Sequence, residues 1–369
     1  MKLPSPEEAA ALADSIDRER READLKAQAA TYRRKYESLL TDLNVDARYQ
    51  RFIGRISECE IDPPKWLAPG KLSKRHVAIP TALLSDAHFD EIVDPRQVLG
   101  VNGYNREIAT KRLRNFFVNS IKLGDSFVTG IDYPGFVLAV AGDLFSGDIH
   151  DELRETNEDV LYASILYWLG PMSAGIKMLA ERYGKVFIPW VVGNHGRATK
   201  KPQSKRGVRA NVDWLLGQLL AREFASDPRV TFSISESFDL PYKVYGTRYM
   251  LTHGNQFRGG SGISGVFAPL FIGDARKRKK QQSVKQPYDV LVMGHWHQYL
   301  PMESLIINGS IKGYCEYADN SNFSYEPPRQ AWWLTDPDHG ITLRAPIFVQ
   351  DESEQWARAE STEVEWLNR

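Results

Sequence analysis

The sequence predicts an α/β (α+β) fold in which two mixed β-sheets pack face to face, with helices on their outer surfaces. From about Val77 onward, short buried apolar runs alternate with helical stretches, which is typical of parallel strands joined by helices. The second half is richer in short strands with two-sided patterns, which favours hairpins. A composition of 42% hydrophobic and 25% charged residues is ordinary for a globular chain of 369 residues.

Residues 1–60 differ from the rest of the chain and predict a long N-terminal helix. Ser5-Pro6-Glu7-Glu8 forms a capping box with proline at the first helical position, and the charged stretch to about Asn44 contains no glycine. A heptad seam is formed by Leu25, Ala29, Tyr32, Tyr36, Leu39 and Leu43. Three roles stay open: a helix packed on the following domain, a self-associating coiled coil, or a docking arm. Residues 61–76, which include Asp62-Pro63-Pro64, are predicted to be a linker.

One domain is predicted for residues 77–350, followed by a polar tail at 351–369. Buried strands are predicted at residues 81–84, 136–141, 186–192, 249–252 and 290–293, and helices at 105–122, 159–183 and 212–224. Shorter two-sided strands are predicted at residues 230–234, 242–245, 304–308, 330–334 and 341–348.

The bulk properties exclude several classes of protein. The formal net charge is zero, so the surface as a whole does not attract polyanions such as nucleic acid or an anionic membrane. Local basic patches are still compatible with this charge. No apolar run approaches the roughly 20 residues that span a bilayer. Two cysteines, Cys59 and Cys315, make no disulfide framework, and no signal peptide is recognisable. We therefore expect a cytoplasmic protein without a membrane partner.

Five short polar segments each follow or end one of the predicted buried strands. They are Ser85-Asp86-Ala87-His88, Gly142-Asp143, Gly193-Asn194-His195, Thr252-His253-Gly254 and Gly294-His295-Trp296-His297. Open α/β sheets place their ligand sites at the carboxyl ends of strands, so these segments are expected to converge. Five of the eight histidines fall in these segments, whereas His76, His150 and His339 are expected to be ordinary surface or hydrogen-bonded residues.

The residue types in these segments predict a site for two divalent metal ions. Carboxylate, imidazole and amide groups without a thiolate suit Mn²⁺ best, with Fe, Zn²⁺ or Mg²⁺ as alternatives. Asp143 is the predicted bridging ligand, because it is the lone acid in a tight strand-to-loop turn after Gly142. The other candidate ligands are Asp86, His88, Asn194, His253, His295 and His297.

The order Asp-x-His, Gly-Asp, Gly-Asn-His, His-Gly and Gly-His-x-His resembles the calcineurin-like metallophosphoesterase superfamily over about residues 77–350. The resemblance implies a β-sandwich flanked by helices and hydrolysis of a phosphoester by a metal-bridging hydroxide. It implies one metal on Asp86, His88, Asp143 and His297, and the other on Asp143, Asn194, His253 and His295. It also implies that His195 is catalytic. The family often has an acid after Gly-Asn-His, where this chain has Gly196-Arg197. Arg197 is therefore either a phosphate clamp or a solvated loop residue.

Two basic segments, residues 197–209 and 276–280, bear on the choice of substrate. Both are expected to be loops at the rim of the site. Their candidate substrate contacts are Lys200, Lys201, Arg206, Arg276, Lys277 and Arg278. Gly142-Asp143-Leu144-Phe145 resembles the DNA-repair nuclease branch of the superfamily. A phosphodiesterase acting on nucleic acid is the leading hypothesis. A phosphatase or phosphodiesterase for small phosphoesters or nucleotides is the first alternative, and a catalytically silent scaffold is the second.

Overall fold

The computed structural model describes residues 21–35, 37, 64–67, 76–257, 265–351 and 354. The chain divides into two units, Met1–Glu60 and Ile61–Arg369. In the first unit, residues 21–35 and 37 are helical, and the side chains of Leu25 and Tyr32 are exposed. The remaining seam positions Tyr36, Leu39 and Leu43, the capping box and most of the predicted linker lie outside the described residues. Self-association through this helix stays a prediction.

The second unit contains the following elements. Its strands are β1 (His76–Val77), β2 (Ile79–Leu84), β3 (Ile131–Asp132), β4 (Phe136–Val140), β5 (Val186–Trp190), β6 (Val230–Ile234), β7 (Asp239–Val244), β8 (Thr247–Thr252), β9 (Val290–Met293), β10 (Leu300–Pro301), β11 (Leu305–Ile307), β12 (Arg329–Asp336) and β13 (Gly340–Phe348). Its helices are η1 (Lys65–Leu67), η2 (Pro95–Val98), α2 (Arg106–Lys122), η3 (Leu123–Phe127), α3 (Asp151–Thr156), α4 (Leu161–Tyr183), α5 (Val212–Glu223), α6 (Phe267–Ser283) and α7 (Glu316–Asn320). Of the helices in the described residues, none is both long and apolar enough to cross a bilayer.

Two mixed sheets form the framework. The six-stranded sheet has the order β13-β12-β2-β4-β5-β6, in which β2, β4, β5 and β6 are parallel. The five-stranded sheet has the order β10-β11-β9-β8-β7, in which β8, β9 and β11 are parallel. The antiparallel pairs β12–β13 and β7–β8 are hairpins, and each lies at an edge of its sheet. β1 and β3 form a separate parallel pair.

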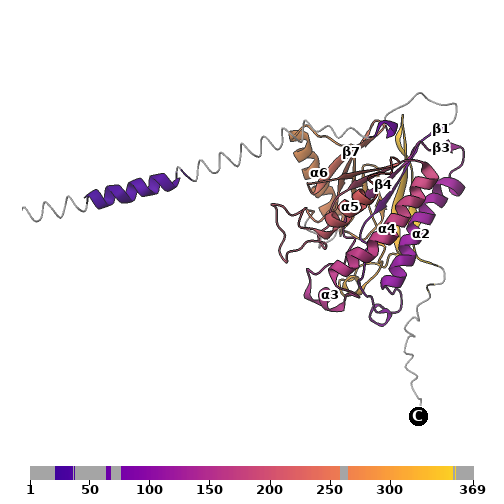
Figure 1. Ribbon diagram of the computed structural model, residues 1–369, viewed down its shortest axis with the longest axis horizontal. Coiled ribbons are helices and arrows are strands. Elements are labelled where there is room, and N and C mark those ends of the chain that lie inside the picture. The colour runs from indigo at the N-terminus through magenta and orange to yellow at the C-terminus, as the bar shows by residue number, and fades with distance from the viewer. Residues whose placement is uncertain are drawn as a thin grey trace, which may run out of the picture. The chain divides into compact units, whose positions relative to one another are not determined.

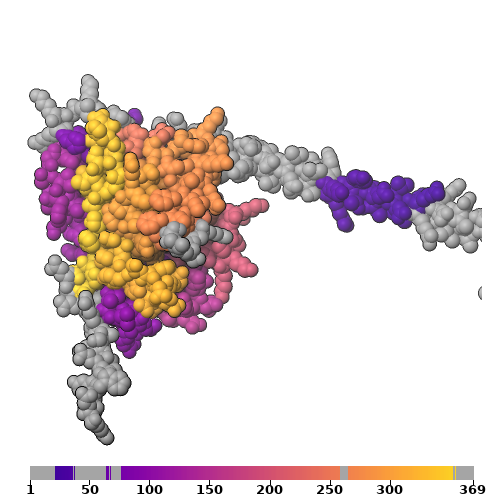
Figure 2. Space-filling model, turned by 180° about the vertical axis from the view of Figure 1, so that it is seen from behind, coloured from indigo at the N-terminus to yellow at the C-terminus, as the bar shows by residue number. Residues whose placement is uncertain are grey.

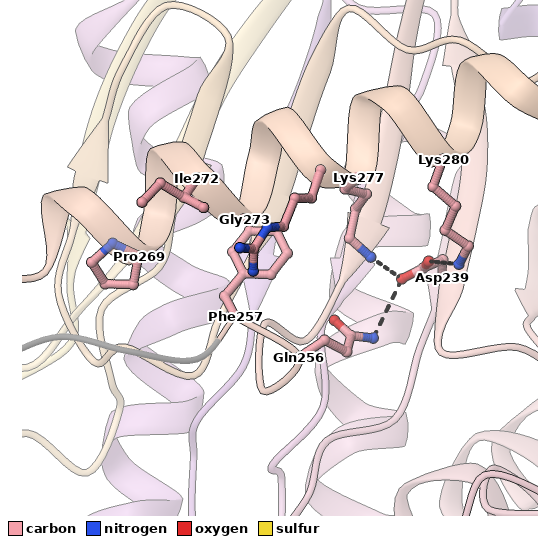
Figure 3. Close-up of a pocket in the computed structure, with 9 residues that line it drawn as sticks. Asp239, Gln256, Phe257, Pro269, Ile272, Gly273, Lys277 and Lys280 are labelled. Carbon is pink, nitrogen blue, oxygen red and sulfur yellow. Dashed lines mark hydrogen bonds and ion pairs between the residues drawn. The ribbon is translucent and has the colours of Figure 1, made fainter.

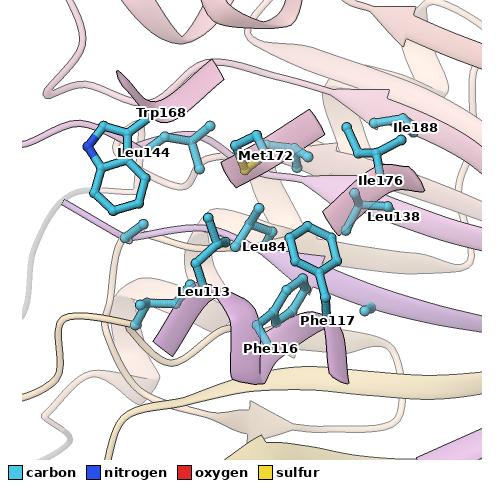
Figure 4. Close-up of a cluster of buried hydrophobic side chains, with 14 of the residues drawn as sticks. Leu84, Leu113, Phe116, Phe117, Leu138, Leu144, Trp168, Met172, Ile176 and Ile188 are labelled. Atoms are coloured by element: carbon cyan, nitrogen blue, oxygen red, sulfur yellow. The ribbon is translucent and has the colours of Figure 1, made fainter. Parts of the chain in front are cut away.

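The buried side chains arrange the sheets and helices in four layers. One cluster joins the facing sides of the two sheets, through residues such as Leu83 of β2 and Leu251 of β8. A second cluster joins the other side of the six-stranded sheet to α2, α4 and α5, and Figure 4 shows Phe116, Phe117 and Met172 packed there against Leu84 and Leu138. A third lies between the five-stranded sheet and α6. Leu83 and Leu84 point to different clusters because side chains alternate along a strand.

This architecture confirms the predicted fold class of packed mixed sheets flanked by helices. Figure 1 shows α2 and α4 together on one side of the sheets and α6 on the other. In Figure 2 the yellow C-terminal strands run beside the purple α2 helix, where Asn115 and Asn119 donate side-chain hydrogen bonds to the carbonyls of Val349 and Phe348.

One element was predicted wrongly. The basic segment around Arg276 was expected to be a loop, but it forms the second half of α6. Arginine and lysine are good helix formers, and no glycine or proline interrupts the segment after Gly273. Pro269 lies in the first turn, where its missing N–H breaks no helical hydrogen bond. A high charge density was therefore a poor indicator of a loop.

Candidate metal centre

The five polar segments converge at the carboxyl ends of strands from both sheets. Asp86 and Asp143 follow β2 and β4 of the six-stranded sheet, and Asn194 follows β5. His253 follows β8 of the five-stranded sheet, and His295 follows its neighbour β9. Because the sheets pack face to face, hydrogen bonds join the two sets across the gap. The His295 backbone N–H donates to Asp86 Oδ1 at 2.9 Å.

Asp86, His88 and His297 form the first group of candidate ligands. Their ligand atoms all lie within 4.8 Å of one another. His88 Nε2 lies 3.1 Å from His297 Nε2, which in turn lies 3.4 Å from Asp86 Oδ1. Asp86 and His88 are buried, whereas His297 is half-buried. The group is therefore partly open to solvent on the His297 side.

Asp143, His253 and His295 form the second group, within the same 4.8 Å limit. His253 Nε2 lies 2.9 Å from Asp143 Oδ2 and 3.1 Å from Asn194 Oδ1, so the amide oxygen belongs to this group as well. Asp143 also forms a close group with His88 and His195. It therefore lies between the other two groups, where a bridging carboxylate would be needed.

The hydrogen-bonding roles of these atoms fit bound cations. His253 Nδ1 lies 2.7 Å from the Ala141 carbonyl oxygen. That oxygen can only accept, so Nδ1 carries a proton, and Nε2 faces two oxygens with its lone pair unless it is protonated too. Burial disfavours a charged His253, but the Asp143 carboxylate outweighs it and raises the pKa of His253 to about 9. A divalent cation would satisfy the same lone pairs without the second proton.

The predicted ligands also concentrate backbone strain. The left-handed region is sparsely populated by residues other than glycine. φ is 52° at Asp86, 46° at His88, 49° at Asp143, 72° at His295 and 53° at His297. Each such residue is strained by about 1–3 kcal/mol, and the conformation persists only where its surroundings enforce it. Clustering of this strain at one set of strand ends is typical of a functional site.

Two glycines allow the strand ends to approach so closely. A Cβ on Gly142 would collide with the Gly193 backbone, and a Cβ on Gly193 would collide with Asp143. Gly142 also has a φ of +82°, which favours glycine. The Gly-Asp and Gly-Asn-His motifs thus have a steric reason for their first residue.

We expect Gly142→Ala to lower the free energy of unfolding by at least about 2 kcal/mol, through the collision and the positive φ. Gly246→Ala is the matched control, because a Cβ there meets nothing within 4 Å, and it should change stability by less than about 0.5 kcal/mol. Urea denaturation of both variants measures the difference. Equal stabilities would show that the strand ends can separate at little cost.

His195 lies beside the two groups, and a backbone oxygen orients its ring. His195 Nδ1 lies 2.9 Å from the Ser146 carbonyl oxygen, so Nδ1 donates and Nε2 is left to exchange a proton. Its backbone N–H donates to Asp143 Oδ1 at 2.6 Å. Burial lowers the pKa of His195, and the Asp143 charge opposes this. The Ser146 carbonyl thus fixes the orientation of the His195 ring.

The Arg197 guanidinium braces its own loop. It donates to three carbonyl oxygens: Nε to Thr199 at 2.9 Å, Nη1 to Asn194 at 2.9 Å and Nη2 to Lys200 at 3.0 Å. Of the two roles predicted from the sequence, this geometry favours neither a free phosphate clamp nor a solvated side chain. Instead, Arg197 fixes the backbone of the candidate ligand Asn194.

The basic residues of the segment after His195 are exposed. Lys200 pairs with Asp151 at 2.7 Å between Nζ and Oδ1, and both side chains are mostly in solvent. Lys201 and Arg206 are exposed as well. These three cations follow the candidate ligand Asn194 by 6 to 12 residues and stay candidates for substrate contacts.

The basic residues of α6 divide into two kinds. Arg276 is exposed, whereas Lys277 is buried with its Nζ 2.5 Å from Asp239 Oδ1. Arg278 pairs with Asp274 at 2.8 Å and lies over the Tyr288 ring. Lys277 and Arg278 are therefore engaged within the fold, contrary to their expected place on a loop at the rim.

Asp213 was missed by the sequence analysis, which placed it only in the first turn of a helix. Its fully buried carboxylate accepts hydrogen bonds from the backbone N–H groups of Asp143, Leu144 and Gly193, at 3.0, 3.2 and 2.9 Å. Burial raises the pKa of Asp213 to about 7, assisted by the nearby Asp143 charge. No local pattern distinguishes such an acid from an ordinary helix-start residue.

Two further supports were missed. Glu91 Oε2 lies 3.3 Å from His88 Nδ1, and Glu91 Oε1 accepts from the buried Lys312 at 2.8 Å. Asn308 donates to Ser85 Oγ at 2.8 Å, next to Asp86. Asn308 follows β11 at the same sheet edge as the five motifs, so its position after an apolar strand was a usable signal.

The sequence matches no protein-family model and no curated protein. Solved structures to which the fold is similar include a predicted phosphoesterase from Streptococcus pneumoniae TIGR4, with 12% identity and a TM-score of 0.27 over 74% of this chain and 98% of the other. Vacuolar Protein Sorting 29 from Cryptosporidium parvum has 14% identity and a TM-score of 0.28 over 73% and 96%. Vps29 complexed with Zn²⁺ from Entamoeba histolytica has 11% identity and a TM-score of 0.28 over 73% and 99%. Similarities this weak carry no conclusion about activity.

Proposed function

We propose that this chain is a phosphoesterase that hydrolyses phosphodiester bonds with two divalent metal ions, Mn²⁺ being preferred. The ions would be held by Asp86, His88, Asp143, Asn194, His253, His295 and His297. The observation that supports this most is that Asp143, a member of the second ligand group, also lies close to His88 of the first group. Both groups consist of buried or half-buried side chains from different sheets. Solvated histidines and acids would have no reason to converge in this way.

The residues of the chain have separate tasks in this reaction. Divalent cations bound here would neutralise charge on the phosphoryl oxygens and lower the pKa of a bound water, so that hydroxide is available near neutral pH. Asp86 and Asp143 provide the negative charge that holds the cations, and the turns at Gly142 and Gly193 fix their spacing. His195 keeps its Nδ1 proton on the Ser146 carbonyl, so its Nε2 would take up the proton that the attacking water loses and pass it to the leaving oxygen, returning to the neutral ring.

Nucleic acid is the proposed substrate class. The exposed cations Lys200, Lys201 and Arg206 follow Asn194 closely in the chain, and Arg276 adds another on α6. In a chain of zero net charge, basic groups gathered near a phosphoester site favour a polyanion. A phosphatase for small phosphoesters or nucleotides is the alternative. A silent scaffold is disfavoured, because a chain that had lost catalysis would have no need to keep seven polar ligands together at one site.

A substrate panel tests this proposal. With Mn²⁺ present, we expect hydrolysis of bis(4-nitrophenyl) phosphate and of labelled single-stranded DNA, and weak hydrolysis of 4-nitrophenyl phosphate. Metal analysis of the same sample gives the number of ions per chain. Hydrolysis of the monoester alone would replace the nuclease hypothesis by a phosphatase. Two bound ions without hydrolysis of any substrate would support the scaffold.

A further inference from the structure

A separate pocket lies between α6 and the ends of β7 and β8. It has a volume of about 220 Å³ and is lined by Asp239, Gln256, Phe257, Pro269, Ile272, Gly273, Arg276, Lys277 and Lys280. Pockets that enclose a whole small ligand usually have roughly 300–1,000 Å³. This pocket therefore suits one part of a larger substrate. None of its residues is among the candidate metal ligands.

The pocket has an apolar end and a charged end. Figure 3 shows Pro269, Ile272 and Phe257 at one end and Lys277, Asp239 and Lys280 at the other. Gly273 makes room for the Phe257 ring, since a Cβ there would lie 2.5 Å from it. The Phe257 ring is only 6% exposed, so the apolar surface against which a base can pack comes mainly from the exposed Ile272 side chain.

The charged end carries more positive than negative charge. Asp239 is its one carboxylate among the lining residues, and it faces two ammonium groups, Lys277 Nζ at 2.5 Å and Lys280 Nζ at 3.4 Å. Arg276 has no hydrogen bond or ion pair to any residue that the structure describes. Arg276 and Lys280 are exposed and able to reach an anion.

The pocket adjoins the metal centre through one strand end. The hydroxyl oxygen of Thr252, which precedes the candidate ligand His253, lies 2.8 Å from Asp239 Oδ1 and 3.1 Å from Gln256 Oε1. Gln256 follows His253 by three residues, which span at most about 11 Å. A strand whose scissile phosphate lies at the metal centre can therefore place a neighbouring unit in the pocket.

We propose that this pocket binds the nucleotide next to the scissile phosphodiester, with its base against Ile272 at the apolar end and its phosphate against Arg276 and Lys280. The assignment rests on the proposed phosphodiesterase function and adds a specificity subsite to it. It explains why apolar groups and exposed cations lie together in this pocket: a nucleotide carries both a planar apolar face and a charged group.

Paired variants on α6 test the pocket. Lys280→Gln and Lys279→Gln remove the same charge from adjacent exposed residues, and Lys280 alone lines the pocket. Ile272→Ser and Phe271→Ser form a second pair, in which Ile272 lines the pocket and Phe271 is exposed outside it. Binding of a fluorescein-labelled single-stranded oligonucleotide is measured by anisotropy in EDTA at constant salt. We expect each pocket variant to raise Kd about tenfold, the effect of one lost contact of roughly 1.4 kcal/mol, with little change in its control.

Competition identifies the occupant. AMP should displace the oligonucleotide at lower concentration than either adenosine or inorganic phosphate, because only AMP fills both ends of the pocket. Equal competition by inorganic phosphate, or equal effects of Lys279→Gln and Lys280→Gln, would overturn the nucleotide assignment. Since binding is measured without divalent ions, its loss is separable from a failure of hydrolysis. If the wild type hydrolyses diesters and every variant binds the oligonucleotide equally well, the nucleotide assignment is wrong and the proposed function stands. If the wild type hydrolyses no diester but only the pocket variants bind more weakly, the proposed catalysis is wrong and the nucleotide assignment stands.

Discussion

Asp143→Asn is expected to lower the turnover of bis(4-nitrophenyl) phosphate by about 10³-fold or more and to reduce the metal content of the protein. Asp143 Oδ2 faces His253 Nε2 at 2.9 Å, and Asp143 Oδ1 accepts the His195 N–H at 2.6 Å. The amide keeps the shape of the side chain but removes the negative charge that a pair of cations requires. Because Asp143 belongs to the second ligand group and also lies close to His88 of the first, both ions should be affected.

The control for this variant is Asp148→Asn, an exposed acid a few residues further along the same segment. It removes one negative charge near the site without touching the ligand groups, and its turnover and metal content should match those of the wild type. Metal content is measured by mass spectrometry after dialysis, and turnover by release of 4-nitrophenolate with added Mn²⁺. Full turnover in Asp143→Asn would contradict the bridging role.

The core strands and long helices could be predicted because their signals are local. β9 and β6 have the predicted bounds, and α2 begins one residue after the predicted start, where Asn105 caps it through a hydrogen bond to the Ile108 N–H. Both signals, a run of apolar residues for a buried strand and a capping side chain for a helix start, are made by residues that are neighbours in the sequence. The convergence of the five motifs followed from strand ends alone, since parallel strands expose their carboxyl ends at one edge.

The supports of the site could not be predicted, because they depend on contacts between distant segments. Ser146 and His195 meet only after β4 and β5 pair, and Glu91 meets Lys312 across the two sheets. The error at Arg276 has a related cause. The sequence shows the charge of a basic cluster, but the pairing of Lys277 with Asp239 decides whether that charge faces solvent.

Asp213→Ala is expected to lower the free energy of unfolding by at least about 3 kcal/mol, because each unsatisfied buried N–H costs about 1–3 kcal/mol and three lose their acceptor. It should also weaken metal binding by about 10–100-fold, as the loss of a group that positions ligands usually does. Asp213→Asn is the graded control: its oxygen can still accept from Gly193 and Asp143, while its NH₂ group faces the Leu144 N–H. Its losses of stability and of metal affinity should therefore be smaller than those of the alanine variant.

Urea denaturation with chelator present measures the stability. Metal titration without denaturant, at a temperature well below the unfolding transition, measures the affinity. An alanine variant with normal stability but weak metal binding would contradict the role given to the three hydrogen bonds. A destabilised variant with normal metal affinity would show that Asp213 holds the strand ends together without setting the ligand positions.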